Sequence, residues 1–153
     1  ARQVEAANAL LAQAGIAPGG YVVLCPFSGS DDREDRKVWP GFAQLARRLS
    51  AQGRTVVVCP GPGEEHAAHE RAPGAVLLPG VGLGTYAALL AMADGVVSND
   101  TGPGHMAAGV GARLVSVFGP PSTAAWAPVG PRVTLFPYEG RWATVDEVAR
   151  ALD

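Results

Sequence analysis

The sequence has few cysteines, few aromatic side chains and little net charge for its 153 residues. Its 12 Lys and Arg residues nearly balance 14 Asp and Glu residues, and the resulting charge of −2 predicts no nucleic-acid partner. No apolar run approaches the roughly 18 residues of a membrane span, and no signal-like segment opens the chain. These absences predict no stable membrane insertion, and they leave a peripheral contact between a longer protein and a membrane open.

The two cysteines, Cys25 and Cys59, match neither a Cys-x-x-Cys pair nor a zinc-binding pattern, so the sequence predicts no metal site. Each cysteine ends an expected strand, which makes a disulfide between neighbouring strands an alternative. A small buried hydrophobic side chain is the favoured role for both. The expectation that follows is a reduced, cytoplasmic protein.

Short apolar runs alternate with helical segments along the whole chain. The expected strands are Tyr21–Cys25, Thr55–Cys59, Ala75–Leu78, Gly95–Ser98, Arg113–Phe118 and Arg132–Phe136. The expected helices are Gly41–Ala51, Glu64–Arg71, Thr85–Met92, Pro103–Val110 and Val145–Leu152, after a helical pattern at Val4, Ala7, Leu10 and Leu11. The alternation predicts an α/β fold, a Rossmann-like doubly wound parallel sheet of about six strands in a single domain spanning residues 1–153. With the strand order 3-2-1-4-5-6, the loops after Cys25 and Ser98 would face each other across one crevice.

The segment Asn99–Ala108 directly follows the β-branched run Gly95–Ser98 and reads Asn-Asp-Thr-Gly-Pro-Gly-His-Met-Ala-Ala. This pattern predicts a strand, a tight glycine-rich turn and the N-terminus of a helix. Pro103 suits the first helical position, which makes Gly102 the expected N-cap. Glycine has no side-chain oxygen to satisfy the amides of residues 104–106, so these donors and the helix dipole predict a phosphate-binding site.

The motif Asp-Thr-Gly-x-x-His-x-x-Ala at residues 100–108, followed by the strand Leu114–Val117 and by Phe118-Gly119-Pro120, resembles the ADP-heptose:lipopolysaccharide heptosyltransferases and related glycosyltransferases. Further segments match in the order of that family's nucleotide-binding half, namely Pro26, Lys37–Pro40, Gly61–Glu64 and Leu78–Gly80. The resemblance implies the C-terminal half of a GT-B type glycosyltransferase, an enzyme with two facing Rossmann-like domains. The chain opens at Ala1, inside a helical pattern and without an initiator methionine, so we expect an N-terminal acceptor-binding domain in a longer protein.

The family's activity implies inverting transfer of a heptose-like sugar from a nucleotide diphosphate donor such as ADP-heptose. The acceptor would be a lipopolysaccharide core or a similar saccharide, bound through the N-terminal domain. The general base would also come from that domain, so we expect no catalytic base here and an inactive isolated chain. His105 and Lys37 would stabilise the departing diphosphate. No cofactor is implied beyond the donor substrate.

The resemblance implies that the glycine-rich turn contacts the donor through Asp100, Thr101, Gly102, Gly104 and His105. For Asp100 and Thr101 the alternative is simple capping of the helix. For His105 the alternative is a neutral imidazole packed against the sheet, since the helix dipole disfavours a cation in the first turn.

Four further donor contacts are implied at the ends of other strands. Ser28 would contact phosphate, with a loop-capping role as the alternative. Lys37 would meet the donor phosphate, although it follows an unusually acidic loop; Arg36 could replace it, and plain solvation is the alternative. Glu64 would bind ribose hydroxyls, whereas an acid in a first helical turn also stabilises the helix dipole. Val81 would line the base pocket or pack in the core.

Other functions are compatible with parts of this pattern. Residues 102–107 satisfy G-x-G-x-x-A, as in dinucleotide-dependent oxidoreductases, but the motif follows the fourth expected strand and no acid lies near Ser122 to hold a ribose. Sugar-nucleotide 2-epimerases share the architecture but carry acids where this chain has His105 and Met106. A non-enzymatic nucleotide-binding module is the remaining alternative.

Overall fold

The computed structural model describes residues 2–27, 38–99, 102–120, 128 and 130–153. Its strands are β1 (Tyr21–Cys25), β2 (Thr55–Val58), β3 (Val76–Leu77), β4 (Gly95–Asn99), β5 (Leu114–Val117) and β6 (Val133–Phe136). Its helices are α1 (Arg2–Gln13), α2 (Phe42–Ala51), α3 (Glu65–Arg71), α4 (Leu83–Met92), α5 (Gly102–Gly109) and α6 (Val145–Ala151). Each expected helix and strand is present, with ends shifted by up to two residues.

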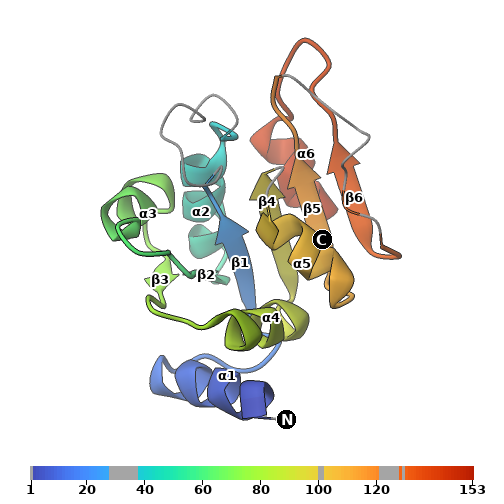
Figure 1. The fold of residues 1–153 in the computed structure, drawn as a ribbon. Coiled ribbons are helices and arrows are strands. Elements are labelled where there is room, and N and C mark those ends of the chain that lie inside the picture. Colours follow the sequence, from blue (N-terminus) through green and yellow to red (C-terminus); the bar gives the residue numbers. More distant parts are fainter. Residues whose placement is uncertain (1, 28–37, 100–101, 121–127, 129) are drawn as a thin grey trace.

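The strands form one sheet in the order β3-β2-β1-β4-β5-β6, and every neighbouring pair is parallel (Figure 1). Val22 of β1 pairs with Val56 on one side and with Gly95 on the other. The chain therefore reverses its direction of travel across the sheet between β1 and β4. This confirms the predicted Rossmann-like order and creates a topological switch point at the carboxyl ends of β1 and β4.

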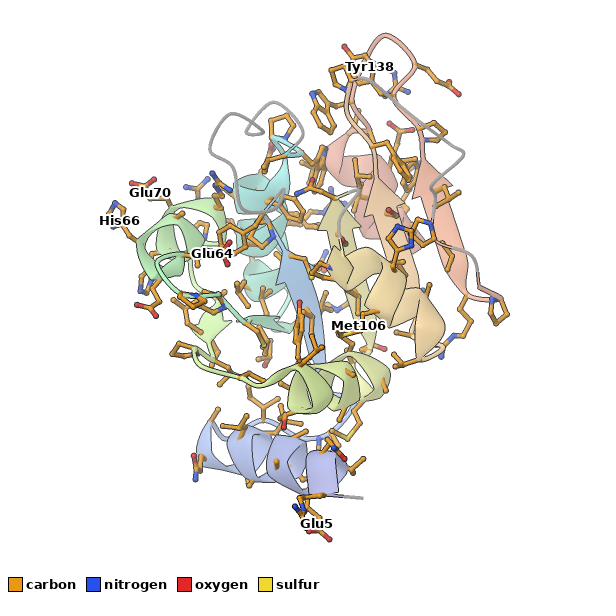
Figure 2. All side chains as sticks on the ribbon, in the orientation of Figure 1. Glu5, Glu64, His66, Glu70, Met106 and Tyr138 are labelled. Carbon is orange, nitrogen blue, oxygen red and sulfur yellow. The ribbon has the colours of Figure 1, made fainter. Side chains whose placement is uncertain are left out.

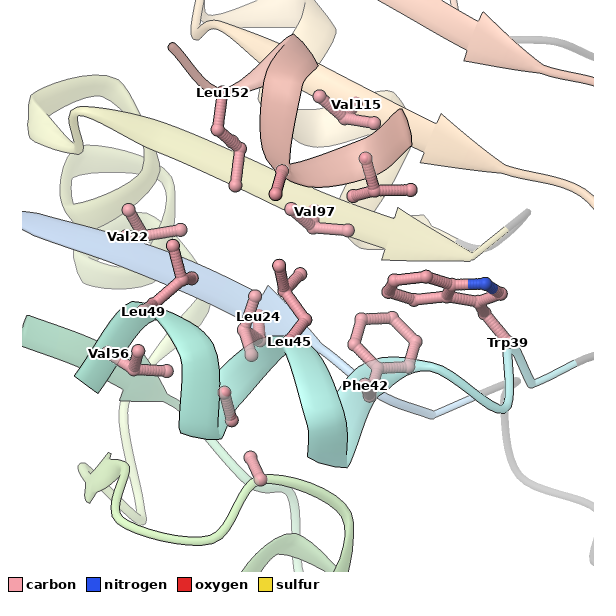
Figure 3. Packing of buried hydrophobic residues seen from close by; sticks show 14 of the residues in the cluster. Val22, Leu24, Trp39, Phe42, Leu45, Leu49, Val56, Val97, Val115 and Leu152 are labelled. Carbon is pink, nitrogen blue, oxygen red and sulfur yellow. The ribbon is translucent and has the colours of Figure 1, made fainter. Parts of the chain in front are cut away.

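Two apolar layers cover the sheet. On one face the alternate residues Val22 and Leu24 pack against α2 and α6, and Figure 3 shows Leu45, Leu49 and Leu152 completing this layer. On the other face the intervening strand residues pack against α4 and α5, with α1 lying outside α4 (Figure 1). Strands buried on both faces read as continuous apolar runs, which is why β1 and β4 are recognisable in the sequence.

Helix α1 confirms the helical pattern expected at the start of the chain. Ala7 and Leu11 are fully buried in the second apolar layer, whereas Val4 is 43% exposed and lies outside the buried stripe. Within the described part of the chain, no helix is both long and apolar enough to cross a membrane.

Candidate functional site

A pocket of about 170 Å³ lies at the carboxyl end of the sheet, at the switch point between β1 and β4. It is lined by Leu24, Cys25, Phe27, Cys59, Glu64, Tyr86, Gly102 and Pro103. These residues come from the end of β1 and the loop after it, from the segment between β2 and α3, from helix α4 and from the start of α5. The pocket thus lies where ligands bind in open α/β sheets, and it unites two of the segments predicted to bind the donor.

Glu64, whose side chain is labelled near α3 in Figure 2, forms one polar side of this pocket. It is the N-cap residue of α3, one position before the first turn in which the sequence placed it, and its side chain makes no capping bond to the helix. The carboxylate instead turns back, and its Oε1 accepts a hydrogen bond of 2.6 Å from the Gly61 amide. The residue is half-buried, so this bond fixes a carboxylate at the pocket. Because the N-cap also lies at the positive end of the helix dipole, the alternative of helix stabilisation stays open.

Two thiols and a phenol meet in the pocket. The Tyr86 hydroxyl of α4 lies 3.2 Å from the Cys25 Sγ, and Cys59 also lines the cavity. Burial raises the pKa of Cys25 to about 11 and that of Cys59 to about 12. Both thiols are therefore protonated at neutral pH, and both are free cysteines, as predicted. Protonated buried thiols act as small apolar groups and not as nucleophiles.

The start of α5 forms the opposite side of the pocket, and it corrects one prediction. The helix begins at Gly102, so Gly102 is the first helical residue and not the N-cap, and Pro103 is the second. The first-turn amides that have no intrahelical partner are accordingly those of Gly102 and Gly104, because Pro103 has none and the amides of residues 105 and 106 fall within the helical ladder. This turn can therefore still bind an anion, but the available amides lie closer to the start of the helix than predicted.

Gly104 and His105 differ in their surroundings. Gly104 is buried, and a Cβ at this position would lie 3.1 Å from the Ser98 Oγ and 3.5 Å from the Asn99 carbonyl oxygen. Glycine thus lets α5 approach the end of β4 closely. His105 is exposed, so the alternative in which its ring packs against the sheet is wrong. An exposed imidazole in the first turn can donate to an anion bound there.

Asn99, the last residue of β4, joins the segments around the crevice, a role the sequence analysis missed. Its side chain is fully buried, and its Oδ1 accepts a 2.8 Å hydrogen bond from the Trp39 amide. Its Nδ2 donates to the Phe27 carbonyl at 3.2 Å and to the Cys25 carbonyl at 3.5 Å. A polar residue ending a fully buried strand was the available signal. Asn99 positions the ends of β1 and β4 relative to each other.

Trp39 anchors the segment that precedes α2. Its ring is 1% exposed and packs edge-on against Phe42, with centroids 5.2 Å apart (Figure 3). Its Nε1 donates a 2.8 Å hydrogen bond to the Ala143 carbonyl before α6. The Trp39–Pro40 pair that leads into α2 is therefore held in place by the buried tryptophan.

The remaining predicted contacts are only partly placed. Val81 is half-buried and packs against the second apolar layer, which agrees with its core alternative and leaves a ligand contact open. Ser28, Lys37, Asp100 and Thr101, together with the substitute Arg36, lie outside the described residues. Among the described residues, no group of three or more metal-ligating side chains is close enough to hold an ion.

The site thus combines apolar walls, one carboxylate, one phenolic hydroxyl and the positive end of a helix. A carboxylate can accept hydrogen bonds from a pair of sugar hydroxyls, and helix amides suit phosphate oxygens. A ligand that carries hydroxyls at one end and anionic oxygens at the other matches this arrangement. The G-x-G-x-x-A stretch follows β4 and not β1, so the structure does not support the dinucleotide fingerprint.

Several solved structures are similar to this chain. A glycosyltransferase family 9 protein from Veillonella parvula matches with a TM-score of 0.81 and 18% identity, over 99% of this chain and 50% of that one. Escherichia coli heptosyltransferase WaaC with ADP matches with a TM-score of 0.75 and 27% identity, over 87% and 43%. The E. coli ADP-heptose LPS heptosyltransferase II matches with a TM-score of 0.72 and 20% identity, over 95% and 50%. The chain therefore spans about half the length of these relatives.

A comparison with curated protein sequences gives no match. The sequence model of one protein family, described as glycosyltransferase family 9 (heptosyltransferase), does match this chain. The match covers residues 2–150, nearly the whole chain. Its strand order and half-length alignment agree with the GT-B relatives. The chain belongs to glycosyltransferase family 9.

Proposed function

We propose that this chain is the donor-binding half of a glycosyltransferase that uses a nucleotide diphosphate sugar, ADP-heptose or a close analogue. The observation that carries the proposal is the pocket at the β1–β4 switch point, bounded by Glu64 and by the start of α5. The similarity to WaaC, solved with ADP and with ADP-2-deoxy-2-fluoro heptose, supports an adenosine diphosphate as the donor's nucleotide.

In this proposal the two sides of the pocket bind different parts of the donor. Glu64 accepts hydrogen bonds from the ribose hydroxyls. The amides of Gly102 and Gly104 and the exposed His105 donate to the diphosphate. Ser28, Lys37 and Thr101 add phosphate contacts, Asp100 orders the loop or bonds the sugar, and Val81 lines the base pocket, as the family resemblance implies.

The size of the pocket supports a divided site. Its volume of about 170 Å³ is smaller than the roughly 300–1,000 Å³ typical of pockets that enclose a whole ligand. The pocket therefore holds part of the nucleotide, and the sugar projects beyond the carboxyl edge of the sheet. We propose that an acceptor-binding domain of a longer protein closes over this edge and excludes water.

The reaction proposed for the longer protein is a single displacement at the anomeric carbon. A hydroxyl oxygen of a lipopolysaccharide core, or of a similar saccharide, attacks that carbon. The bond between the carbon and the diphosphate oxygen breaks, and ADP leaves with the bonding electrons. The hydroxyl proton passes to a carboxylate of the acceptor domain, while this chain's helix amides, His105 and Lys37 stabilise the charge on the leaving diphosphate.

The proposal is tested by calorimetric titration of the chain with ADP, AMP and NAD. We expect ADP to bind more tightly than AMP, because the first-turn amides face a diphosphate. We expect the affinity for NAD to be no higher than that for ADP. Equal affinity for ADP and AMP would contradict the anion-binding role of α5. Preference for NAD would favour an oxidoreductase.

A transfer assay tests the enzyme assignment. The isolated chain and its longer parent protein are each incubated with ADP-heptose and a heptose-acceptor core saccharide. We expect turnover by the parent and none by the chain, since a general base must lie within about 2.6–3.2 Å of the proton it removes and the identifiable acids have donor-side roles. Turnover by the chain at the parent's rate would place the base within it. ADP binding without turnover by either protein would favour a non-enzymatic module.

A further inference from the structure

Among the described residues that line the pocket, Tyr86 alone carries a side-chain hydroxyl, and the proposed function gives it no role. It lies in the first half of α4 and reaches the pocket floor from the helix side of the sheet. Its hydroxyl meets the Cys25 Sγ at 3.2 Å, at the carboxyl end of the central strand β1. In the part of the lining that the structure describes, Glu64 and Tyr86 thus supply the carboxylate and the hydroxyl.

Packing alone does not explain this hydroxyl. A thiol is a weak hydrogen-bond partner, and the pocket around it is otherwise formed mainly by apolar groups such as Leu24 and Phe27. Tyr86 is half-buried and lines the pocket, so its hydroxyl, bonded to a thiol alone, keeps a hydrogen-bonding capacity toward a ligand that a phenylalanine would lack. Burial, followed by the neighbouring Cys25, raises the pKa of Tyr86 far above its ordinary value, so the hydroxyl keeps its proton and can donate.

The position of Tyr86 within the pocket indicates what the hydroxyl meets. Strand β1 lies between β2, which leads to Glu64, and β4, which leads to the start of α5. The hydroxyl at the end of β1 is thus between the proposed ribose side and the proposed diphosphate side. The part of a nucleotide that joins these two ends is the phosphate attached to the ribose.

We propose that the Tyr86 hydroxyl exchanges its thiol partner for an oxygen of the nucleotide's α-phosphate when the donor binds, and so contributes directly to donor affinity. The inference rests on the proposed function, because it assumes a nucleotide in this pocket. It adds a binding residue on α4, a helix that lies outside the glycine-rich turn.

The test is calorimetric titration of the wild-type chain and of Tyr86→Phe with ADP, AMP and adenosine. Loss of a hydrogen bond to a charged oxygen predicts about tenfold or greater weakening for ADP and AMP, and less than about twofold for adenosine. Tyr138→Phe is the matched control; Tyr138 packs against Trp142 beyond β6 and outside the pocket lining, so all three affinities should stay unchanged. Equal weakening for adenosine would overturn the α-phosphate contact and assign the hydroxyl to the nucleoside.

Cys25→Ala, alone and combined with Tyr86→Phe, tests whether the Tyr86 hydroxyl contacts the ligand or only holds Cys25 in place. If Tyr86 contacts the ligand, Tyr86→Phe weakens ADP binding by the same factor in a Cys25→Ala background as in the wild type. If the hydroxyl acts only by holding Cys25, the substitution has no effect in that background. A wild-type chain that binds no ADP would reject the proposed function, whereas normal ADP binding by Tyr86→Phe would reject this inference alone.

Discussion

The two edges of this sheet each carry a hollow of similar size, but their polar groups are arranged in opposite ways. At the amino edge a hollow of about 210 Å³ contains Arg54, which pairs with Asp94 at 2.7 Å and with Asp153 at 3.8 Å. The Asp94 amide also donates to the Tyr21 carbonyl at 2.8 Å. The charges that line this edge are thus matched within the chain.

At the carboxyl edge the pocket of about 170 Å³ keeps polar groups that are poorly matched among the described residues. Glu64 has a single amide partner, and Tyr86 has a thiol. The start of α5 adds amides without intrahelical partners. Cavity size therefore does not distinguish the two edges, whereas the incomplete pairing of polar groups does. Substitutions in the pocket at the carboxyl edge should mainly change ligand affinity, and those in the hollow at the amino edge should change stability alone.

Asn99→Leu should be an exception to this rule, because Asn99 affects both stability and ligand affinity at the carboxyl edge. Asn99→Leu leaves the buried Trp39 amide and the Phe27 carbonyl without their partner, which should lower the free energy of unfolding by about 2–4 kcal/mol. ADP affinity should fall as well, because the ends of β1 and β4 are no longer held together. Urea unfolding and calorimetry measure the two effects. Asn8→Leu, on the exposed face of α1, is the matched control and should change stability by less than about 0.5 kcal/mol.

His105→Ala should weaken ligand binding without changing stability. The side chain is exposed, so its removal leaves the fold intact. Loss of a hydrogen bond to a charged phosphate oxygen should weaken ADP binding by about 1.5–3 kcal/mol. His66→Ala, on the exposed surface of α3, serves as the comparison. An ADP affinity equal to that of the wild type would remove His105 from the donor site.

Arg54→Ala should lower stability without changing ligand binding. The Asp94 side chain is about half exposed, so the pair contributes modestly, and unfolding should become easier by about 0.2–1 kcal/mol. ADP binding should not change, because Arg54 lies at the opposite edge from the pocket. Reduced ADP affinity in a stable Arg54→Ala protein would show that the two edges are coupled.

The smallest expected effect concerns pH and the outer part of the carboxyl edge. The Arg141 guanidinium, and then the Thr144 amide, lower the pKa of Glu147 to about 2. Because the folded pKa lies below the unfolded value, this contribution to stability is present above about pH 4.5 and is lost as the pH falls toward 2. Thermal unfolding of Glu147→Gln over that range should depend less on pH than unfolding of the wild type. Arg141→Met should reduce the dependence similarly, and an unchanged dependence in both would contradict the assignment.

The sheet was largely predictable from the sequence, because each strand is a short run of mainly apolar, β-branched residues set between helical segments. The N-terminus of α5 was predicted one residue too late, at Pro103 instead of Gly102. The sequence did not distinguish the two, since either residue is compatible with the start of a helix. Glu64 could be placed at the crevice because strand order determines which loops meet there.

Asn99 and Tyr86 could not be assigned in the same way. The bonds of Asn99 join residues that are 60 to 74 positions apart, and their existence depends on strand register. Tyr86 occupies an apolar stretch of α4 in which any aromatic residue suits the core. Its role depends on the packing of that helix over the end of β1, which a local pattern does not determine.

The position of β1 in the strand order also has a consequence for the order of folding during synthesis. Cys25 and its partner segment near Asn99 are separated by 74 residues, which a ribosome adds in about 4–15 seconds. Until then β1, a central and fully buried strand, has a neighbour on one side only, and its other edge is open to pairing with foreign chains. A nascent chain stalled after α4 should therefore aggregate, whereas one extended past β4 can close the sheet.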